Sequence, residues 1–142
     1  MSSAAALSSC GIETRRVRRW AIHPRSVGLA RDELRVALVE WELTGIEDSA
    51  VLILSELVTN AVRHARVPGG HFDTSFCRST GGVRLAVDDA DERHPEARPQ
   101  SEAGGRGLAL IEALSDRWGV RTRRGVGKSV WAVVTVPGGR WF

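Results

Sequence analysis

The order in which helical and strand-like segments follow one another restricts the fold of this chain more than any single motif. A strand-like segment at 15–24 precedes two helical segments, at 26–43 and at about 48–65, whose apolar residues recur at the spacing of one helix face. Two strand pairs follow, and a third helical segment at 107–119 separates them. This order predicts an α+β two-layer sandwich, with a mixed, mostly antiparallel sheet and the helices on one face.

Each strand pair is expected to form a hairpin. The first pair, 71–79 and 83–90, is split by a Gly-Gly turn, and the second pair, 120–125 and 128–137, surrounds a glycine-containing turn. Hairpins have antiparallel strands, so they supply most of the predicted sheet.

The first strand-like segment, 15–24, is expected at a sheet edge. Val17, Trp20 and Ile22 alternate with arginines, and Pro24 closes the segment. Because proline cannot donate a hydrogen bond within a sheet, the segment is predicted to be an edge strand whose arginines face the solvent and whose apolar residues anchor it.

The length and composition indicate one globular domain. The chain has 142 residues, 42% of them apolar, and a net charge of +3 with a pI of about 9.6. We expect a disordered tail at 1–13, the folded domain at 14–138 and a short tail at 139–142. Cys10 and Cys77 form no CxxC pair, so we expect two reduced thiols in a cytoplasmic protein, and no apolar run reaches the ~18 residues of a membrane span.

One helical segment carries polar residues on a single stripe. At ~100° per residue, Glu56, Asn60 and Arg63 fall within about 60° of one another, and the apolar residues spread over the opposite side. Two interpretations remain open. The stripe is either a solvated surface, with Glu56 paired to Asn60 or Arg63, or a polar face that meets a ligand.

A second polar cluster follows the apolar run of the first hairpin. Asp88, Asp89 and Asp91 stand where the strand is expected to end. Buried carboxylates need donors, so their partners are an exocyclic amine, a cation or water, unless the cluster is a solvated turn. A calcium loop is disfavoured, because the glycine of its sharp turn is missing.

A third element is the stretch GGRGLAL. Gly104, Gly105 and Gly107 precede a helical pattern, and Arg106 adds a positive charge. Glycines that lead into a helix expose backbone N–H groups that suit phosphate, although the same pattern is ordinary turn chemistry. The spacing fits neither the dinucleotide fingerprint nor the Walker loop.

Together, LILSELVTNAVRHA, LAVDDA and GGRGLAL, in this order, resemble the N, G1 and G2 boxes of one superfamily. It is the ATPase and kinase superfamily of gyrase, the heat-shock chaperone, sensor histidine kinases and mismatch-repair proteins. The short spacing and the closing GKSVWAVVTVP resemble its small branch of anti-sigma-factor serine/threonine kinases. Two departures are that no glycine follows Asp89 in the G1 box and that Ala109 replaces a common glycine in the G2 box.

The resemblance implies a role for each candidate residue. Asn60 would coordinate Mg²⁺ on the ATP phosphates, and Glu56 would be the general base. Asp89 would accept a hydrogen bond from the adenine amino group, with Ser129 near the adenine. Backbone N–H groups would contact the phosphates at Gly105, Gly107 and Leu108. Further nucleotide-binding candidates are Arg63, Asp91 and Arg106.

The resemblance thus implies a Mg-ATP-dependent kinase that phosphorylates a serine of an antagonist protein. Its other implied protein partner is a sigma-factor-like regulator, and a homodimer is a further expectation. One alternative is a partner-switch module that holds nucleotide without turnover. Another is a basic nucleic-acid-binding protein that uses the N-terminal arginines, which is disfavoured because no helix-turn-helix spacing occurs and no exposed aromatic residues interleave with the basic ones.

Overall fold

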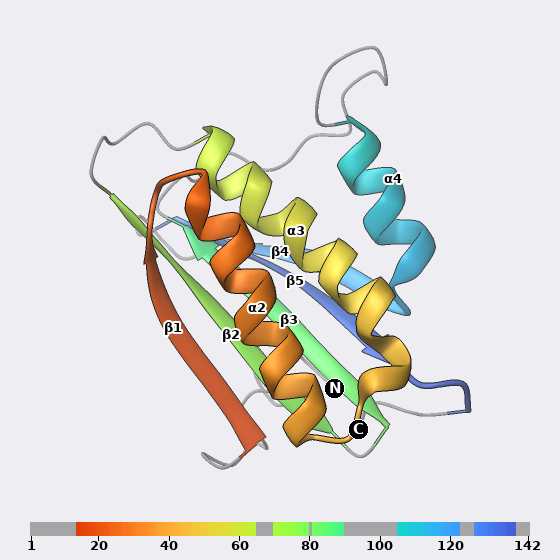
Figure 1. Ribbon diagram of the computed structural model, residues 1–142. Coiled ribbons are helices and arrows are strands. Elements are labelled where there is room, and N and C mark those ends of the chain that lie inside the picture. Colours follow the sequence, from red (N-terminus) through yellow and green to blue (C-terminus); the bar gives the residue numbers. More distant parts are fainter. Residues whose placement is uncertain (1–13, 65–69, 80, 90–104, 123–126, 139–142) are drawn as a thin grey trace.

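The structure is a computed structural model that describes residues 14–64, 70–79, 81–89, 105–122 and 127–138. Strands and helices follow one another in the expected order (Figure 1). In chain order they are β1 (Arg15–Ala21), α2 (Arg25–Glu40), η2 (Thr44–Ile46), α3 (Glu47–His64), β2 (His71–Ser79), β3 (Gly82–Asp89), α4 (Gly105–Leu114), β4 (Arg117–Thr122) and β5 (Lys128–Thr135).

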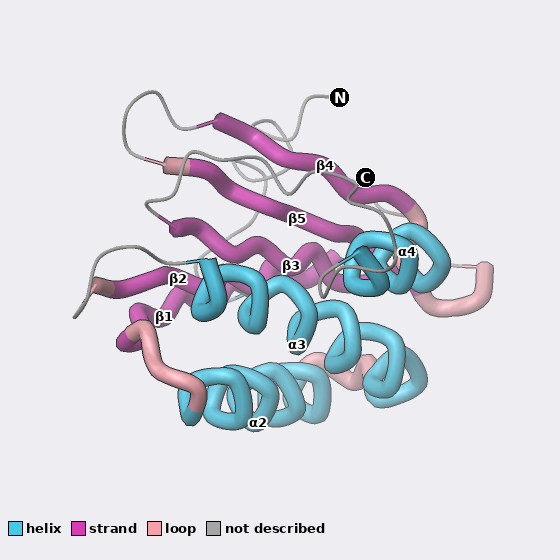
Figure 2. The backbone as a smooth tube through the Cα atoms, turned by 90° about the horizontal axis from the view of Figure 1, so that it is seen from above, coloured by secondary structure: helices cyan, strands magenta, loops and turns pink. Residues whose placement is uncertain are grey.

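The strands form one sheet in the order β1-β2-β3-β5-β4, and all four neighbouring pairs are antiparallel. Helices α2, α3 and α4 lie on one face of this sheet (Figure 2). The predicted α+β two-layer sandwich is therefore confirmed, as are both hairpins, β2–β3 and β4–β5. The pairing of β3 with β5 joins the two hairpins at the centre of the sheet.

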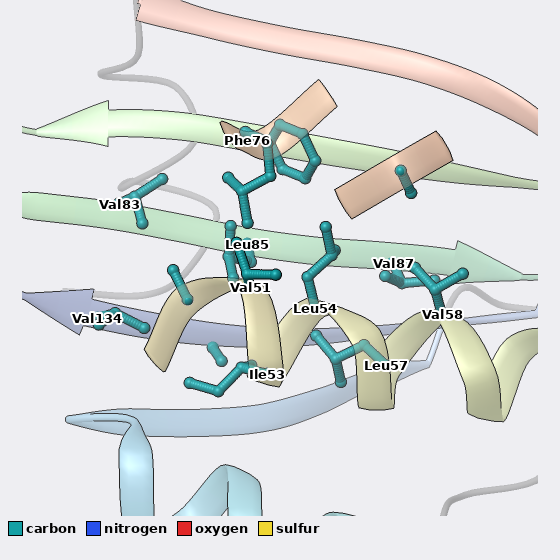
Figure 3. Close-up of a cluster of buried hydrophobic side chains, with 14 of the residues drawn as sticks. Val51, Ile53, Leu54, Leu57, Val58, Phe76, Val83, Leu85, Val87 and Val134 are labelled. Atoms are coloured by element: carbon teal, nitrogen blue, oxygen red, sulfur yellow. The ribbon is translucent and has the colours of Figure 1, made fainter. Parts of the chain in front are cut away.

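The core lies between α3 and the centre of the sheet. Leu54 and Val58 of α3 are fully buried, and they face Leu85 and Val87 of β3 (Figure 3). At roughly 25 cal/mol per Å² of apolar surface, burying side chains of this size is the main stabilising term of such a layer. Helices α2 and α4 pack against α3 on either side, and the sheet packs against its apolar face. Together these contacts fix the position and rotation of α3.

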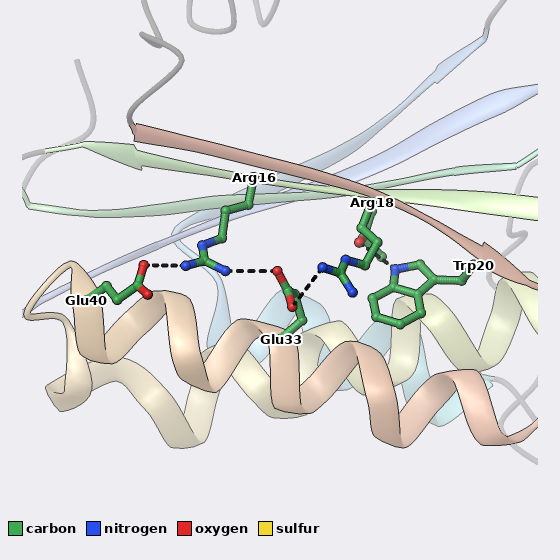
Figure 4. Close-up of polar contacts among 6 residues, drawn as sticks. Arg16, Arg18, Trp20, Glu33 and Glu40 are labelled. Atoms are coloured by element: carbon green, nitrogen blue, oxygen red, sulfur yellow. Dashed lines mark hydrogen bonds and ion pairs between the residues drawn. The ribbon is translucent and has the colours of Figure 1, made fainter.

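Strand β1 is an edge strand, as predicted, but the expected direction of its side chains is partly wrong. Val17 is 57% exposed and does not anchor the strand. Arg16 instead faces α2, where it pairs with Glu33 at 2.9 Å and also with Glu40 (Figure 4). Side chains along a strand point alternately to the two faces of the sheet. The half-buried Trp20 points to the face that α2 covers, and Arg16, four positions earlier, lies on the same face.

Replacing Arg16 tests whether this contact holds β1 against α2. The hydrogen bond to Glu40, helped by Glu33, raises the pKa of Arg16 above its ordinary value. We expect Arg16→Met to lower the free energy of unfolding by about 1 kcal/mol in low salt, and by less in 1 M salt, since half-exposed pairs are screened. The control is Asp32→Asn, which removes a more exposed ion pair to Arg35 within α2. Equal losses in urea melts of the two variants would contradict the bridging role.

Two helices end earlier than predicted. Helix α2 stops at Glu40 rather than near Leu43, and α4 stops at Leu114 rather than at Gly119. Gly119 is not a helix terminus, because it lies within β4, where a Cβ atom would stand 2.8 Å from the Trp131 ring. The glycine provides room for that ring instead of ending a helix.

The same Trp131 ring lies on the sheet face that the helices leave uncovered, where it also contacts Arg84. The guanidinium carbon of Arg84 lies 5.2 Å from the ring centroid, in the range of a cation–π contact. Burial lowers the pKa of Arg84, and the nearby charge of Asp88 acts in the opposite direction. Strands β3, β4 and β5 are therefore packed together on this face as well.

The remaining expectations concern the cysteines, the tails and the membrane. Cys77 is buried and disulfide-bonded, so the prediction of two reduced thiols is wrong for this residue. Cys10 and both predicted tails, 1–13 and 139–142, lie outside the described residues. Within the described ranges, no helix is long and apolar enough to cross a bilayer.

Candidate functional site

The polar stripe of α3 is half-buried rather than fully exposed. Glu56 and Asn60 are both partly covered, whereas Arg63 is exposed in the last turn. Leu57, which lies beside Asn60 around the helix, is buried on the side of α3 that faces β5 and α4 (Figure 3). The stripe therefore borders the side on which α4 packs.

Glu56 and Asn60 are not used by the fold itself. Among the described residues, the structure records no side-chain hydrogen bond or ion pair for either one. The interpretation in which Glu56 pairs with Asn60 or Arg63 is therefore wrong. A carboxylate and an amide one turn apart, about 6 Å along the helix axis, remain available to one ligand.

These two groups fit a magnesium ion bound with phosphate. Mg²⁺ prefers oxygen ligands, and it commonly takes only one or two from the protein and the rest from water and phosphates. The described residues contain no cluster of three or more His, Cys, Asp or Glu side chains that could hold a metal ion. The Asn60 amide oxygen could be the protein ligand of a metal that arrives with its own anionic ligand.

The aspartate predicted at the strand end lies next to α3. Asp89 is the last residue of β3 and only 7% exposed. It lies on the helix-covered face of the sheet, because Val87, two positions earlier, belongs to the core beside Val58 of α3 (Figure 3). Asp89 therefore lies on the sheet face that is covered by α3, the helix that carries Glu56 and Asn60.

The glycine-rich stretch forms the start of α4. Gly105, Arg106 and Gly107 are the first residues of this helix rather than a turn before it. The first four N–H groups of a helix have no partner within the helix, and its dipole favours anions there. Leu108 and Ile111 are buried and fix α4 against the core. The start of α4, the end of β3 and the C-terminal half of α3 lie at the same end of the molecule (Figure 1).

Ser129 does not fit its predicted place beside the adenine. In the β3–β5 pairing, Asp89 stands opposite Lys128, and Ser129 stands opposite Asp88. Since side chains alternate, Ser129 points to the sheet face away from the helices, and Lys128 shares the face of Asp89. The Nζ atom of Lys128 lies 3.5 Å from Oδ1 of Asp89, with both side chains less than 10% exposed.

The structure places most of the predicted residues on α3, β3 and α4, the elements that reach one end of the molecule (Figure 1). Glu56 and Asn60 lie in the C-terminal half of α3, Asp89 ends β3, and Gly105 and Gly107 begin α4. Arg63 is exposed in the last turn of α3. Asp91 lies outside the described residues, and only the backbone of Arg106 is described. Sequence reasoning missed Lys128, although it is the only lysine in the chain and directly precedes Ser129.

Comparison with known proteins identifies the family. A family model described as the histidine kinase-like ATPase domain matches residues 20–134, which include α3, the end of β3 and α4. A search of curated proteins found no match. Because the family model spans most of the chain, the protein belongs to the histidine kinase-like ATPase family.

Proposed function

We propose that this histidine kinase-like ATPase domain binds Mg-ATP at the end of the sheet where α3, β3 and α4 meet. The main support is the pair Glu56 and Asn60, which are half-buried and unpaired within the described residues. Polar groups of a helix that packs well usually find partners in the protein or face water fully. Helix α4 packs against the helix that carries both residues, and the N–H groups of its first turn suit phosphate.

Each residue then has one task. The Asn60 amide oxygen holds Mg²⁺, which neutralises phosphate charge when bound. Asp89 accepts a hydrogen bond from the exocyclic amine of the base. The backbone of Gly105, Gly107 and Leu108 donates to the phosphates, since these residues lie in the first turn of α4.

We further propose that the domain is a serine/threonine protein kinase of the anti-sigma-factor type. Glu56 takes the proton of an incoming serine hydroxyl, whose oxygen forms a bond to the γ-phosphorus. The bond from that phosphorus to the β–γ bridging oxygen breaks, and ADP leaves. The phosphorylated serine belongs to an antagonist protein in the cytoplasm, and a sigma-factor-like regulator binds elsewhere on the domain.

The structure offers one surface that suits a protein partner or a second copy. Helix α2 exposes Leu29, Val36 and Val39, which are 48%, 49% and 61% exposed. Exposed apolar side chains grouped on one helix favour a protein interface. The nucleic-acid alternative is weakened, because Arg16 and Arg19 of β1 are already engaged by carboxylates of this chain.

Calorimetry with Mg-ATP tests the nucleotide site. The parent is expected to bind ATP more tightly with Mg²⁺ than with EDTA. In Asn60→Ala, the increase in ATP affinity that Mg²⁺ gives should fall by about tenfold or more. Substitutions of residues that only support a metal ligand already cost about tenfold in metal affinity. The control is Thr59→Ala, a neighbouring half-buried position turned about 100° away on α3. No binding of ATP, ADP or GTP by the parent would overturn the proposal.

A further inference from the structure

The sheet face opposite the helices is buried at its centre, although no helix among the described residues lies on it (Figure 2). Phe76 and Leu85 belong to the core, and side chains alternate along a strand, so the next residue of β2, Cys77, and the preceding residue of β3, Arg84, point to this helix-free face. Cys77 and Arg84 stand opposite each other and are only 1% and 3% exposed. The outer face of an antiparallel sheet commonly meets water. Another part of the chain must therefore cover it.

A hydroxyl group gives separate evidence of this cover. Ser75 lies on the same face as Cys77, and its Oγ atom is buried without a hydrogen-bond partner among the described residues. A serine on an open sheet surface would bond to water instead, since burying a hydroxyl without a partner costs free energy. The Trp131 ring lies against Arg84, but its strand, β5, is separated from β2 by β3. The ring therefore does not account for the burial of Ser75 and Cys77.

The bonding of Cys77 identifies the covering segment. Cys77 is disulfide-bonded, and the chain contains only one other cysteine, Cys10. The structure comprises a single chain, so Cys10 is the bonded partner. A disulfide holds its two Cα atoms within about 7 Å of each other. Because Cys77 points to the helix-free face, the segment that carries Cys10 has to approach from that face.

The sequence before β1 suits this position. Arg15, the first residue of β1, stands opposite Cys77, and Cys10 lies five residues earlier. Five residues span at most about 18 Å, which is enough to turn back over the face. Residues 1–13 contain one charged side chain, Glu13, and otherwise only apolar and small polar residues. Burying them against a sheet therefore costs little desolvation of charge.

We infer that residues 1–13 form a strap over the helix-free face, which a Cys10–Cys77 disulfide holds closed and a dithiol reductant opens. In opening, the reductant supplies two electrons and two protons: the S–S bond breaks, both cysteines become thiols, and the reductant is oxidised to a disulfide. The strap lies on the sheet face away from α3 and its residues Glu56 and Asn60, so this inference goes beyond the proposed nucleotide site and does not depend on it.

The opened face would be basic. Burial lowers the pKa of Arg84, and the nearby charges of Arg121, Arg117 and Arg15 act in the same direction. These arginines therefore surround Arg84 closely enough to affect its charge. A nearly uncharged strap covers this group without adding a further positive side chain, and reduction would expose it to water.

Peptide mapping tests the bond in the full-length protein, purified without reductant. Trypsin cleaves after Arg15, Arg66 and Arg78, so residues 1–15 and 67–78 should appear as one linked species that dithiothreitol separates. Dithiothreitol should also lower Tm by roughly 10 °C, since the bond closes a long loop. Free thiols at Cys10 and Cys77 in the parent, or a disulfide between two chains on a non-reducing gel, would overturn the inference.

Alkylation of Cys77 tests the cover itself. Cys10→Ser leaves Cys77 as a thiol, which should react with iodoacetamide in the folded protein at no less than about a tenth of its rate in urea, because thiol reactivity follows exposure. The control, Ser9→Ala, keeps both cysteines and should react at neither. If Cys77 of folded Cys10→Ser reacts about a thousandfold more slowly than in urea, the sheet alone buries it and the strap is excluded. The parent reduced with dithiothreitol gives the same measurement if Cys10→Ser does not fold.

Discussion

Gly82→Ala is expected to destabilise the whole domain. A Cβ atom on Gly82 would lie 2.3 Å from the carbonyl oxygen of Val134 and 2.9 Å from Cα of Thr135. Both are backbone atoms of β5, so no side-chain rotation can relieve the contact, and β3 and β5 must separate locally. These strands join the two hairpins of the sheet. Overpacking of this kind costs typically 1–3 kcal/mol and more where the backbone must move, so we expect a loss of about 3 kcal/mol.

Thermal unfolding followed by circular dichroism measures this loss. For a domain of this size, about 3 kcal/mol lowers Tm by roughly 10 °C. The matched control is Gly45→Ala in η2, where the added Cβ meets nothing within 4 Å, and its Tm should stay close to that of the parent. If both variants melt together at the temperature of the parent, the close approach of β3 and β5 at Gly82 is wrong.

The role of Gly82 also shows which part of the fold the sequence could predict. Alternating residues on both sides of Gly82 predicted the β2–β3 hairpin correctly, because hairpin pairing is local. The sequence marked Gly82 only as a turn residue, whereas it is the first residue of β3 and lies against β5. That contact joins segments about fifty residues apart, and no local pattern encodes it.

Helix ends were harder to predict for a different reason. The apolar Trp118 continues the helical spacing of the preceding segment, and Gly119 resembles a helix stop. The sheet overrides this local signal, because β4 pairs with β5 from Arg117 onward and Gly119 lies under the Trp131 ring. A glycine that provides room for a tryptophan looks the same in the sequence as one that ends a helix.

In the candidate site, too, the sequence predicts what depends on local patterns but not what depends on contacts between distant segments. Glu56 and Asn60 lie on one helix, so a helical wheel predicts that they share a stripe, and the structure agrees. The choice between Ser129 and Lys128 depends on strand register, where a shift of one residue exchanges the two sheet faces. Only the pairing of Asp89 with Lys128 identifies the side chain that faces the site.

Glu56→Gln is expected to have the largest effect on activity, if Glu56 is the general base. Glutamine keeps the shape and polarity of the side chain but cannot take up a proton at neutral pH. General bases contribute typically 10²–10⁴-fold in rate, so ATP turnover should fall by about that factor. Binding of Mg-ATP should change little, because Asn60, Asp89 and the first turn of α4 remain in place.

The measurement is phosphate release at saturating Mg-ATP, with water as the acceptor in place of the serine. Glu47→Gln is the control, since Glu47 lies in the first turn of the same helix, about 13 Å along its axis from Glu56, and should keep the activity of the parent. Turnover by Glu56→Gln at the rate of the parent would exclude Glu56 as the base. A parent that binds Mg-ATP without turning it over would instead favour the partner-switch alternative, in which the same half-buried stripe holds the nucleotide and its occupancy carries the signal.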